Sequence, residues 1–163
     1  MRRYLKKYPS GIGELFLISD EEYLLSISFE RPDSNDCIIE DTPALRAAER
    51  WLEEYFGGGK PDICSVPFRM EGTPFEREVW SILLTIGYGK TMTYGEIAAV
   101  IAERRGMKRM SAQAVGGAVG RNRLPVLIPC HRVLGKDGRI TGYAGGIDKK
   151  IRLLEIENIY WRW

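Results

Sequence analysis

The chain has 163 residues, of which 44% are hydrophobic and 28% charged, and its formal net charge at pH 7 is +2. This composition is typical of a globular protein with one ordinary domain or two small ones. No apolar run approaches the ~20 residues that span a membrane, and the N-terminus lacks a signal-peptide core, so we expect a cytoplasmic protein. Three cysteines without a Cys-x-x-Cys pair, and one histidine, argue against a disulfide scaffold and a structural zinc site.

Charge is distributed unevenly along the chain. Residues 1–71 contain nine Lys or Arg and fourteen Asp or Glu, whereas residues 72–163 contain fifteen and eight. Between residues 103 and 123 a single acid, Glu103, accompanies six bases: Arg104, Arg105, Lys108, Arg109, Arg121 and Arg123. Such clustering is typical of a surface that binds a polyanion. An ordinary solvated surface explains the charge alone equally well.

The first part of the chain, residues 1–72, predicts a small α+β domain. Residues 13–18 and 23–29 have the composition of two strands joined by residues 19–22, which predicts a short antiparallel sheet. Thr42 followed by Pro43 predicts the start of a helix. Its apolar face repeats at helical spacing at Leu45, Ala48, Leu52, Tyr55 and Phe56, before three glycines end it. Residues 60–72 predict a connection, with 63–68 as a further candidate strand.

The second part, residues 73–163, predicts a mostly helical domain. Thr73 with Glu76, and Thr93 with Glu96, have the spacing of a capping box at a helix start. Ser111 then predicts the cap of a third helix that runs to about residue 121. Two short helices joined by the basic turn predict a helix-turn-helix. An ordinary helical hairpin is the alternative.

The third predicted helix has almost no long side chains, because its sequence from Ser111 to Gly120 is built from alanine, glycine and valine. Each interior glycine costs a helix up to about 1 kcal/mol relative to alanine, so three of them need a compensating reason. Val115 and Val119 can anchor one face. The small face then permits close approach by a neighbouring helix or by a nucleic-acid groove, with nearby arginines on the phosphates.

The chemistry-bearing run is Pro129-Cys130-His131-Arg132-Val133, which contains the only histidine. A free thiol has a pKa of about 8.5, and an imidazole can accept or relay its proton, which suggests covalent chemistry on sulfur. Adjacent residues of an extended chain point to opposite sides, so a bridging water or a sharp bend after Pro129 is required. A buried, inert cysteine beside a partly exposed histidine is the alternative.

Two further motifs accompany this run: Asn122-Arg123-Leu124-Pro125 before it and Gly142-Tyr143-Ala144-Gly145-Gly146 after it. Together they resemble the O6-alkylguanine-DNA alkyltransferase family, also called methylated-DNA–protein-cysteine methyltransferases. The resemblance extends from about Thr73 to Glu157, and the N-terminal part matches only in size and α+β pattern. It implies DNA repair by irreversible, single-turnover transfer of the alkyl group from O6-alkylguanine in double-stranded DNA to Cys130. O4-alkylthymine is a further candidate substrate.

The resemblance also implies roles for individual residues. Cys130 is similar to the alkyl acceptor, and His131 to the residue that withdraws the thiol proton through a water. Glu157, on the last predicted helix, resembles the carboxylate that orients this histidine. Tyr94 resembles the tyrosine that donates a proton as guanine leaves, and Asn122 the hinge asparagine that braces the turn before the cysteine segment.

Binding residues follow in the same way. Val133, Tyr143 and Ala144 are expected to line the base pocket, although family members often have serine where this chain has Ala144. The expected DNA contacts are Gln113, Ala114, Gly117, Arg109 and Arg121. Gln113 stands where the family often places an arginine that fills the gap left by the flipped nucleotide, so the plug is weaker or comes from Arg109.

Further expectations follow from the chemistry that the resemblance implies. A thioether on Cys130 resists water, so we expect one turnover, with no cofactor and no metal. We also expect a monomeric protein.

Two other functions use the same residues. A cysteine hydrolase or acyltransferase would employ Cys130, His131 and Glu157 over many turnovers, but it leaves the Gly/Ala helix and the basic turn unexplained. A non-catalytic lesion-recognition module would bind DNA without an acceptor, which Cys130 argues against.

Overall fold

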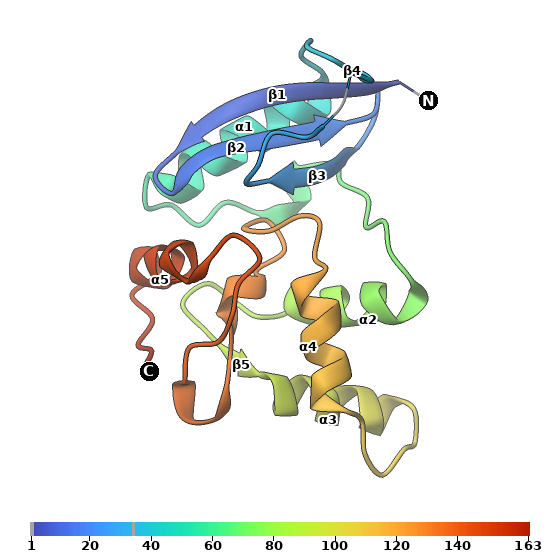
Figure 1. Ribbon diagram of the computed structural model, residues 1–163, viewed down its shortest axis with the longest axis vertical. Helices are drawn as coiled ribbons and strands as arrows, with labels where there is room; N and C mark the ends of the chain where they lie inside the picture. The colour runs from blue at the N-terminus through green and yellow to red at the C-terminus, as the bar shows by residue number, and fades with distance from the viewer. Residues whose placement is uncertain (1, 34) are drawn as a thin grey trace. The chain divides into compact units, whose positions relative to one another are not determined.

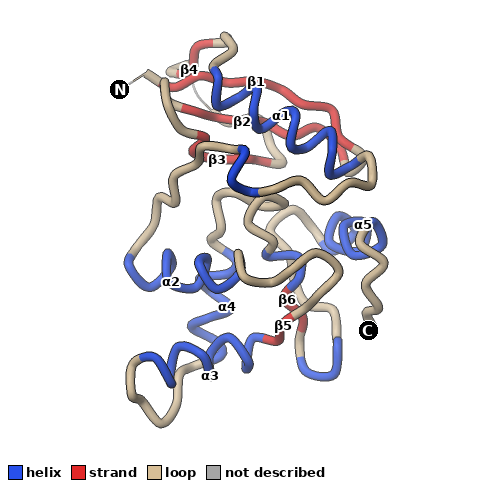
Figure 2. The backbone as a smooth tube through the Cα atoms, turned by 180° about the vertical axis from the view of Figure 1, so that it is seen from behind, coloured by secondary structure: helices blue, strands red, loops and turns tan. Residues whose placement is uncertain are grey.

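The computed structural model describes residues 2–33 and 35–163. Its first unit, residues 1–71, consists of a four-stranded sheet and one long helix (Figure 1). The strands are β1 (Arg3–Ser10), β2 (Gly13–Ser19), β3 (Leu24–Ser28) and β4 (Cys37–Ile38), in the order β3-β2-β1-β4. Neighbours pair antiparallel except β4, which runs parallel to β1. Helix α1 (Pro43–Phe56) covers one face of the sheet, as Figures 1 and 2 show from opposite sides.

Local chemistry explains the start of α1 and its attachment to the sheet. The Thr42 hydroxyl accepts from the backbone N–H of Leu45 at 3.1 Å and lies 2.8 Å from the hydroxyl of Ser19 on β2. The cap therefore satisfies one of the first backbone donors of the helix and ties the helix to the strand. The two predicted strands and the predicted helix are confirmed.

Two features of this unit differ from expectation. β1 was not predicted, because Lys6, Lys7 and Pro9 interrupt its apolar residues; it pairs with β2 from Tyr4 to Ser10. The candidate strand at 63–68 is wrong. Residues Ile63–Ser65 form a 3₁₀ turn, η1, whose start is capped by the Asp62 carboxylate. Within residues 63–68, Phe68 forms an isolated β-bridge with Leu24.

Four helices and a pair of two-residue strands form the second unit, residues 72–163. The helices are α2 (Pro74–Leu83), α3 (Tyr94–Arg104), α4 (Ala112–Gly120) and α5 (Ile147–Ile156), and β5 (Met92–Thr93) pairs parallel with β6 (Val133–Leu134). A 3₁₀ turn, η3 (Lys136–Gly138), follows β6. Both predicted capping boxes are formed, at Thr73 and at Thr93. In the part of the chain that the structure describes, no helix is long and apolar enough to cross a membrane.

Helix α4 packs against α2 and α3, and its small residues permit this closeness (Figure 1). The indole N–H of Trp80, on α2, donates to the carbonyl of Ala118 at 2.8 Å. A Cβ added at Gly116 would lie 3.6 Å from the Tyr94 ring on α3, which is ordinary contact. The fully buried Ala118 is thus held against α2, whereas packing against α3 does not require a glycine at position 116.

The segment after α4 carries the motif and turns sharply before the cysteine. Pro129 has φ −79° and ψ 64°, and Cys130–Arg132 form one 3₁₀ turn, η2, before β6 begins. Val126 has φ 72°, a conformation that a β-branched residue rarely adopts, and it is buried. The β5–β6 pair aligns Thr93 with Leu134, which brings Tyr94, the first residue of α3, beside the cysteine segment.

Candidate active site

A cavity of about 620 Å³ lies between the small-residue face of α4 and the segment that carries the motif. Cys130 lines it and is 6% exposed, so the sulfur is covered but reachable from this opening. The cavity is lined by Tyr94, Ala112, Gln113, Gly116, Val119, Gly120, Asn122, Pro125, Cys130, Thr141, Gly142, Tyr143 and Ala144. Because the lining is mostly apolar and includes two glycines of α4, the cavity suits a flat, uncharged ring system.

The Cys130 sulfur is held as a thiol in the resting protein. Burial raises the pKa of the Cys130 thiol, and this outweighs hydrogen bonds with Asn122 and Tyr143 and the positive charge of Lys150, which act in the opposite direction. A protonated sulfur is a weak nucleophile, so the site needs a base that removes the proton during the reaction.

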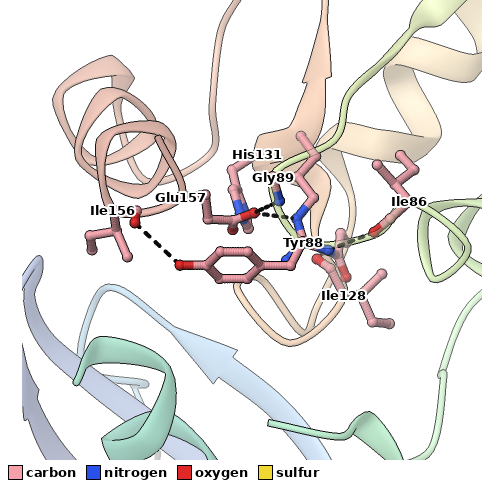
Figure 3. Close-up of polar contacts among 9 residues, drawn as sticks. Ile86, Tyr88, Gly89, Ile128, His131, Ile156 and Glu157 are labelled. Carbon is pink, nitrogen blue, oxygen red and sulfur yellow. Dashed lines mark hydrogen bonds and ion pairs between the residues drawn. The ribbon is translucent and has the colours of Figure 1, made fainter. Parts of the chain in front are cut away.

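His131 is the candidate base, and Glu157 orients it. The Nε2 atom of His131 lies 2.5 Å from Oε2 of Glu157, and both side chains are fully buried (Figure 3). Burial lowers the pKa of His131 even though the carboxylate beside it acts to raise it, so the imidazole is neutral at pH 7. With its Nε2 proton directed at Glu157, the ring presents Nδ1 as its acceptor.

Arg132 completes the support of the carboxylate. Its Nε donates to Oε1 of Glu157 at 2.8 Å. The backbone N–H of Gly89 donates to the same oxygen at 3.0 Å (Figure 3). Burial alone would raise the pKa of Glu157, but its hydrogen bonds with His131, Arg132 and the backbone of Gly89 lower it to about 2. Glu157 is the residue directly after the last turn of α5, not within the helix as predicted.

The Arg132 guanidinium has two further partners on the loop between α2 and β5. Its Nη1 donates to the carbonyl of Ile86 at 2.6 Å, and its centre lies 5.7 Å from the ring of Tyr88. The Tyr88 hydroxyl in turn donates to the carbonyl of Ile156 at 3.2 Å (Figure 3). Sequence reasoning assigned Arg132 no role. The sequence gives no local signal for this role, because the acceptor on Glu157 is distant along the chain.

Tyr94 reaches the cavity from the first turn of α3. Its hydroxyl lies 2.8 Å from the hydroxyl of Thr141, and burial raises the pKa of Tyr94, so the phenol stays protonated. Thr141 also accepts from the ammonium of Lys150 at 3.1 Å. Neither Thr141 nor Lys150 was singled out from the sequence. Lys150 lies on the apolar face of α5 with Leu153 and Leu154, which is the pattern that would have identified it as buried.

Asn122 connects the two ends of the segment before the cysteine. Its Nδ2 donates to the carbonyl of Ile128 at 2.9 Å, and its Oδ1 accepts from the backbone N–H of Leu124 at 3.0 Å. The side chain is buried, and it also makes the hydrogen bond with Cys130 described above. Asn122 therefore bridges the two ends of the irregular segment and also contacts the Cys130 thiol.

Of the three residues predicted to bind the base, two line the cavity and the third, Val133, is buried behind it. Tyr143 and Ala144 line the cavity. Val133 is fully buried in β6, where its carbonyl oxygen accepts from the Lys150 ammonium at 2.8 Å.

The residues predicted to contact DNA lie on α4 and the turns at its two ends. Gln113 and Ala114 are exposed on the first turn of α4, and Gln113 also lines the cavity. Arg109 is exposed in the turn between α3 and α4. Arg121, at the end of α4, forms a short ion pair with Glu76, and a Cβ at Gly117 would lie 3.1 Å from its guanidinium.

Comparison with known families agrees with this geometry. Residues 74–159 match the model of the 6-O-methylguanine DNA methyltransferase, DNA binding domain, and residues 4–70 match that of the 6-O-methylguanine DNA methyltransferase, ribonuclease-like domain. The two matches together cover nearly the whole chain.

Individual relatives give the same result. The chain is 38% identical over 160 residues to the methylated-DNA–protein-cysteine methyltransferase of Haemophilus influenzae, covering 96% of this chain and 87% of the relative. It is 36% identical to the constitutive enzyme of that name from Bacillus subtilis, covering 98% of each. The crystal structure of Mycobacterium tuberculosis O6-methylguanine methyltransferase superposes with a TM-score of 0.79 at 37% identity, covering 95% of this chain and 92% of that one. This chain therefore belongs to the 6-O-methylguanine DNA methyltransferase family.

Proposed function

We propose that this protein repairs double-stranded DNA by transferring the alkyl group of O6-alkylguanine to Cys130, once per molecule. One observation carries the proposal: the thiol of Cys130 lines a cavity beside α4, and the next residue, His131, is held by a buried carboxylate. The proposal is supported by the names of the relatives and by a structure of the M. tuberculosis homologue in complex with DNA, whose chain superposes with a TM-score of 0.78 at 36% identity, covering 97% of this chain and 93% of that one.

The reaction follows from the resting protonation states. Neutral His131 takes the Cys130 proton at Nδ1 through a water, and the sulfur attacks the alkyl carbon. The new S–C bond forms as the C–O6 bond breaks, and the electron pair of that bond passes to the base. The Tyr94 hydroxyl donates its proton to the departing base, which then leaves neutral. The product is a thioether that water does not cleave, so each molecule acts once and needs neither metal nor cofactor.

The position of the sulfur requires the base to leave the duplex. A stacked guanine cannot reach a side chain at the base of a cavity, so the nucleotide rotates into it at a cost of a few kcal/mol. We propose that α3 and α4 act as the helix-turn-helix that binds the groove, with Gln113 and Ala114 against the DNA and Arg109 on a phosphate. Gln113 would enter the gap left by the nucleotide, and Arg121 would shift from Glu76 to make a phosphate contact.

A stoichiometric mass measurement tests the proposal. The protein is incubated with excess duplex DNA that contains O6-methylguanine, and intact and peptide masses are recorded. We expect a gain of one methyl group on Cys130, no further turnover, and no gain in Cys130→Ala. Cys64→Ala, which removes an exposed thiol, is the matched control and should react fully.

Three other results would contradict this function. Product beyond one equivalent indicates a hydrolase or acyltransferase. Tight binding to lesion DNA without methyl transfer indicates a recognition module. A methyl group on a different residue excludes Cys130 as the acceptor. The same assay with O4-methylthymine defines the substrate range, and sedimentation of the free protein and its DNA complex tests the proposed monomer. Fractionation of the source cells tests its proposed cytoplasmic location.

A further inference from the structure

We propose that Lys150 and Thr141 form a proton relay that resupplies Tyr94 as the base departs. This inference rests on the proposed function, since Tyr94 needs a departing base to protonate. Lys150 and Thr141 are thereby assigned as positioning and proton-supplying residues behind Tyr94, which remains the group that faces the substrate.

The three side chains form a continuous hydrogen-bonded path. The Lys150 Nζ lies 3.1 Å from the Thr141 Oγ1, which lies 2.8 Å from the Tyr94 hydroxyl. Both Tyr94 and Thr141 line the cavity that holds Cys130, whereas Lys150 is 1% exposed and lies behind them on α5. The path therefore runs from the interior of the unit to the cavity wall.

The direction of the hydrogen bonds follows from the chemistry of the groups. An ammonium group only donates, so the Thr141 oxygen accepts from Lys150. The single hydroxyl proton of Thr141 can then point to the Tyr94 oxygen. Tyr94 in turn can direct its own proton into the cavity, which is the orientation that a proton donor to a bound base requires.

The surroundings of Lys150 make it a ready proton source. Its hydrogen-bond partners are three neutral oxygens: Thr141 Oγ1, the carbonyl of Val133 at 2.8 Å and the carbonyl of Gly142 at 3.4 Å. Burial lowers the pKa of Lys150 to about 8, although the Cys130 charge acts to raise it. The titratable groups that face it are Cys130 and His131 on η2 and, through Thr141, Tyr94 on α3.

The order of acidities gives the relay its direction. Burial raises the pKa of Tyr94 above its ordinary value of 10.0, whereas that of Lys150 is about 8. When Tyr94 has given its proton to the base, a proton moves from Thr141 to Tyr94 and another from Lys150 to Thr141. The step leaves a neutral phenol, a neutral hydroxyl and a neutral amine. A tyrosinate, which burial disfavours, does not accumulate.

Two substitutions at one position separate the hydroxyl from the shape of the side chain. Thr141→Val keeps the shape and removes the relay, and Thr141→Ser keeps the hydroxyl. The rate of methyl transfer from duplex DNA containing O6-methylguanine is measured in a single turnover at saturating DNA between pH 6 and 10. We expect Thr141→Val to be about tenfold slower at pH 7, and Thr141→Ser to approach the unchanged protein.

The pH profile is the readout that a structural role would not alter. In the unchanged protein and in Thr141→Ser the rate should fall as Lys150 loses its proton above pH 8, whereas in Thr141→Val this fall should be absent. Lys150→Met should show the same loss, and adding Thr141→Val to it should cost nothing further. Arg152→Met, which removes an exposed charge from the same helix, is the control and should leave the profile unchanged.

The outcomes are distinguishable from failure of the proposed function. If the unchanged protein transfers methyl but Thr141→Val has the same rate and profile, the relay is excluded. Equal slowing in Thr141→Ser and Thr141→Val also excludes it, because the hydroxyl then contributes nothing. Absence of transfer by the unchanged protein overturns the proposed function, and the relay with it. Should Lys150→Met fail to fold, the two Thr141 variants decide.

Discussion

Arg132 and Glu157 form a buried ion pair in which Nε of the arginine lies 2.8 Å from Oε1 of the carboxylate. Because this oxygen also accepts from the backbone of Gly89, the other oxygen, Oε2, is the one that binds His131. Three consecutive residues of the motif thus have separate tasks. Cys130 lines the cavity, Arg132 holds the Glu157 carboxylate that binds His131, and in the proposed mechanism His131 relays the thiol proton.

Glu157→Gln is expected to slow transfer by at least about tenfold, because the amide stabilises a protonated imidazole far less than a carboxylate does. It should also lower the free energy of unfolding by about 3 kcal/mol, since Arg132 is left buried without a charged partner. Single-turnover kinetics and urea denaturation measure the two effects. Glu155→Gln, an exposed position on α5, should change neither. An unchanged transfer rate in Glu157→Gln would remove the acid from the mechanism.

Stability should decrease toward acidic pH in two stages. The folded pKa of His131 is lowered from its ordinary 6.5, so the unfolded chain binds this proton first, and stability declines as the pH falls below 6.5. The folded pKa of Glu157 is about 2 against an ordinary 4.5, so its contribution is complete above pH 4.5 and is lost as the pH falls toward 2. Urea titrations at pH 7, 5.5, 4 and 3 measure the decline. In Glu157→Gln the stage below pH 4.5 should be weaker, and an identical slope there would contradict the assignment.

Trp80→Phe should lower the free energy of unfolding by about 2 kcal/mol. The change removes the indole donor to the Ala118 carbonyl, which keeps only its hydrogen bond from the backbone N–H of Arg121, and leaves a small void in the core. Trp163→Phe, at a side chain that is 72% exposed, is the matched control and should have little effect. Equal loss in both variants would show that the indole hydrogen bond does not hold α4 against α2.

Gln113→Arg should tighten binding to duplex DNA containing O6-methylguanine, because a guanidinium stacks better than an amide and adds a charge near the phosphates. The slope of log affinity against log salt should steepen by about one unit. Fluorescence anisotropy at several salt concentrations measures both. Gln113→Met, which keeps the length without charge, should not steepen the slope. Unchanged or weaker binding by the arginine variant would show that glutamine is not a deficient plug here.

Much of the helical architecture could be predicted because its determinants are local. The side chains of Thr42, Thr73, Thr93 and Ser111 each accept a backbone N–H at a helix start, and each was recognisable from its spacing to the residues that follow. Strand β1 was missed because its partner, β2, supplies the stabilisation, while its own sequence contains two lysines and a proline. Strand pairing depends on residues distant in sequence, so the sequence of β1 alone does not indicate that it forms a strand.

The site was predictable in its motif but not in its surroundings. The bend at Pro129 could be anticipated, because adjacent side chains of an extended strand point to opposite sides and could not act together. Lys150 and Thr141 could not be anticipated, since they become neighbours through the return of α5 beside β6, which is a tertiary arrangement. Arg132 shares this limit, because its acceptor lies twenty-five positions away in the sequence.

Helix α5 and the residue after it carry both a buried amine and a buried acid, which reach the acceptor segment from one side. A fragment that ended before residue 147 would keep the complete Pro-Cys-His-Arg-Val sequence. It would nevertheless lack the group that orients its imidazole and the group that fixes the carbonyl of Val133. If the proposed mechanism holds, the Pro-Cys-His-Arg-Val sequence alone is insufficient, and repair depends on the final seventeen residues as much as on the cysteine.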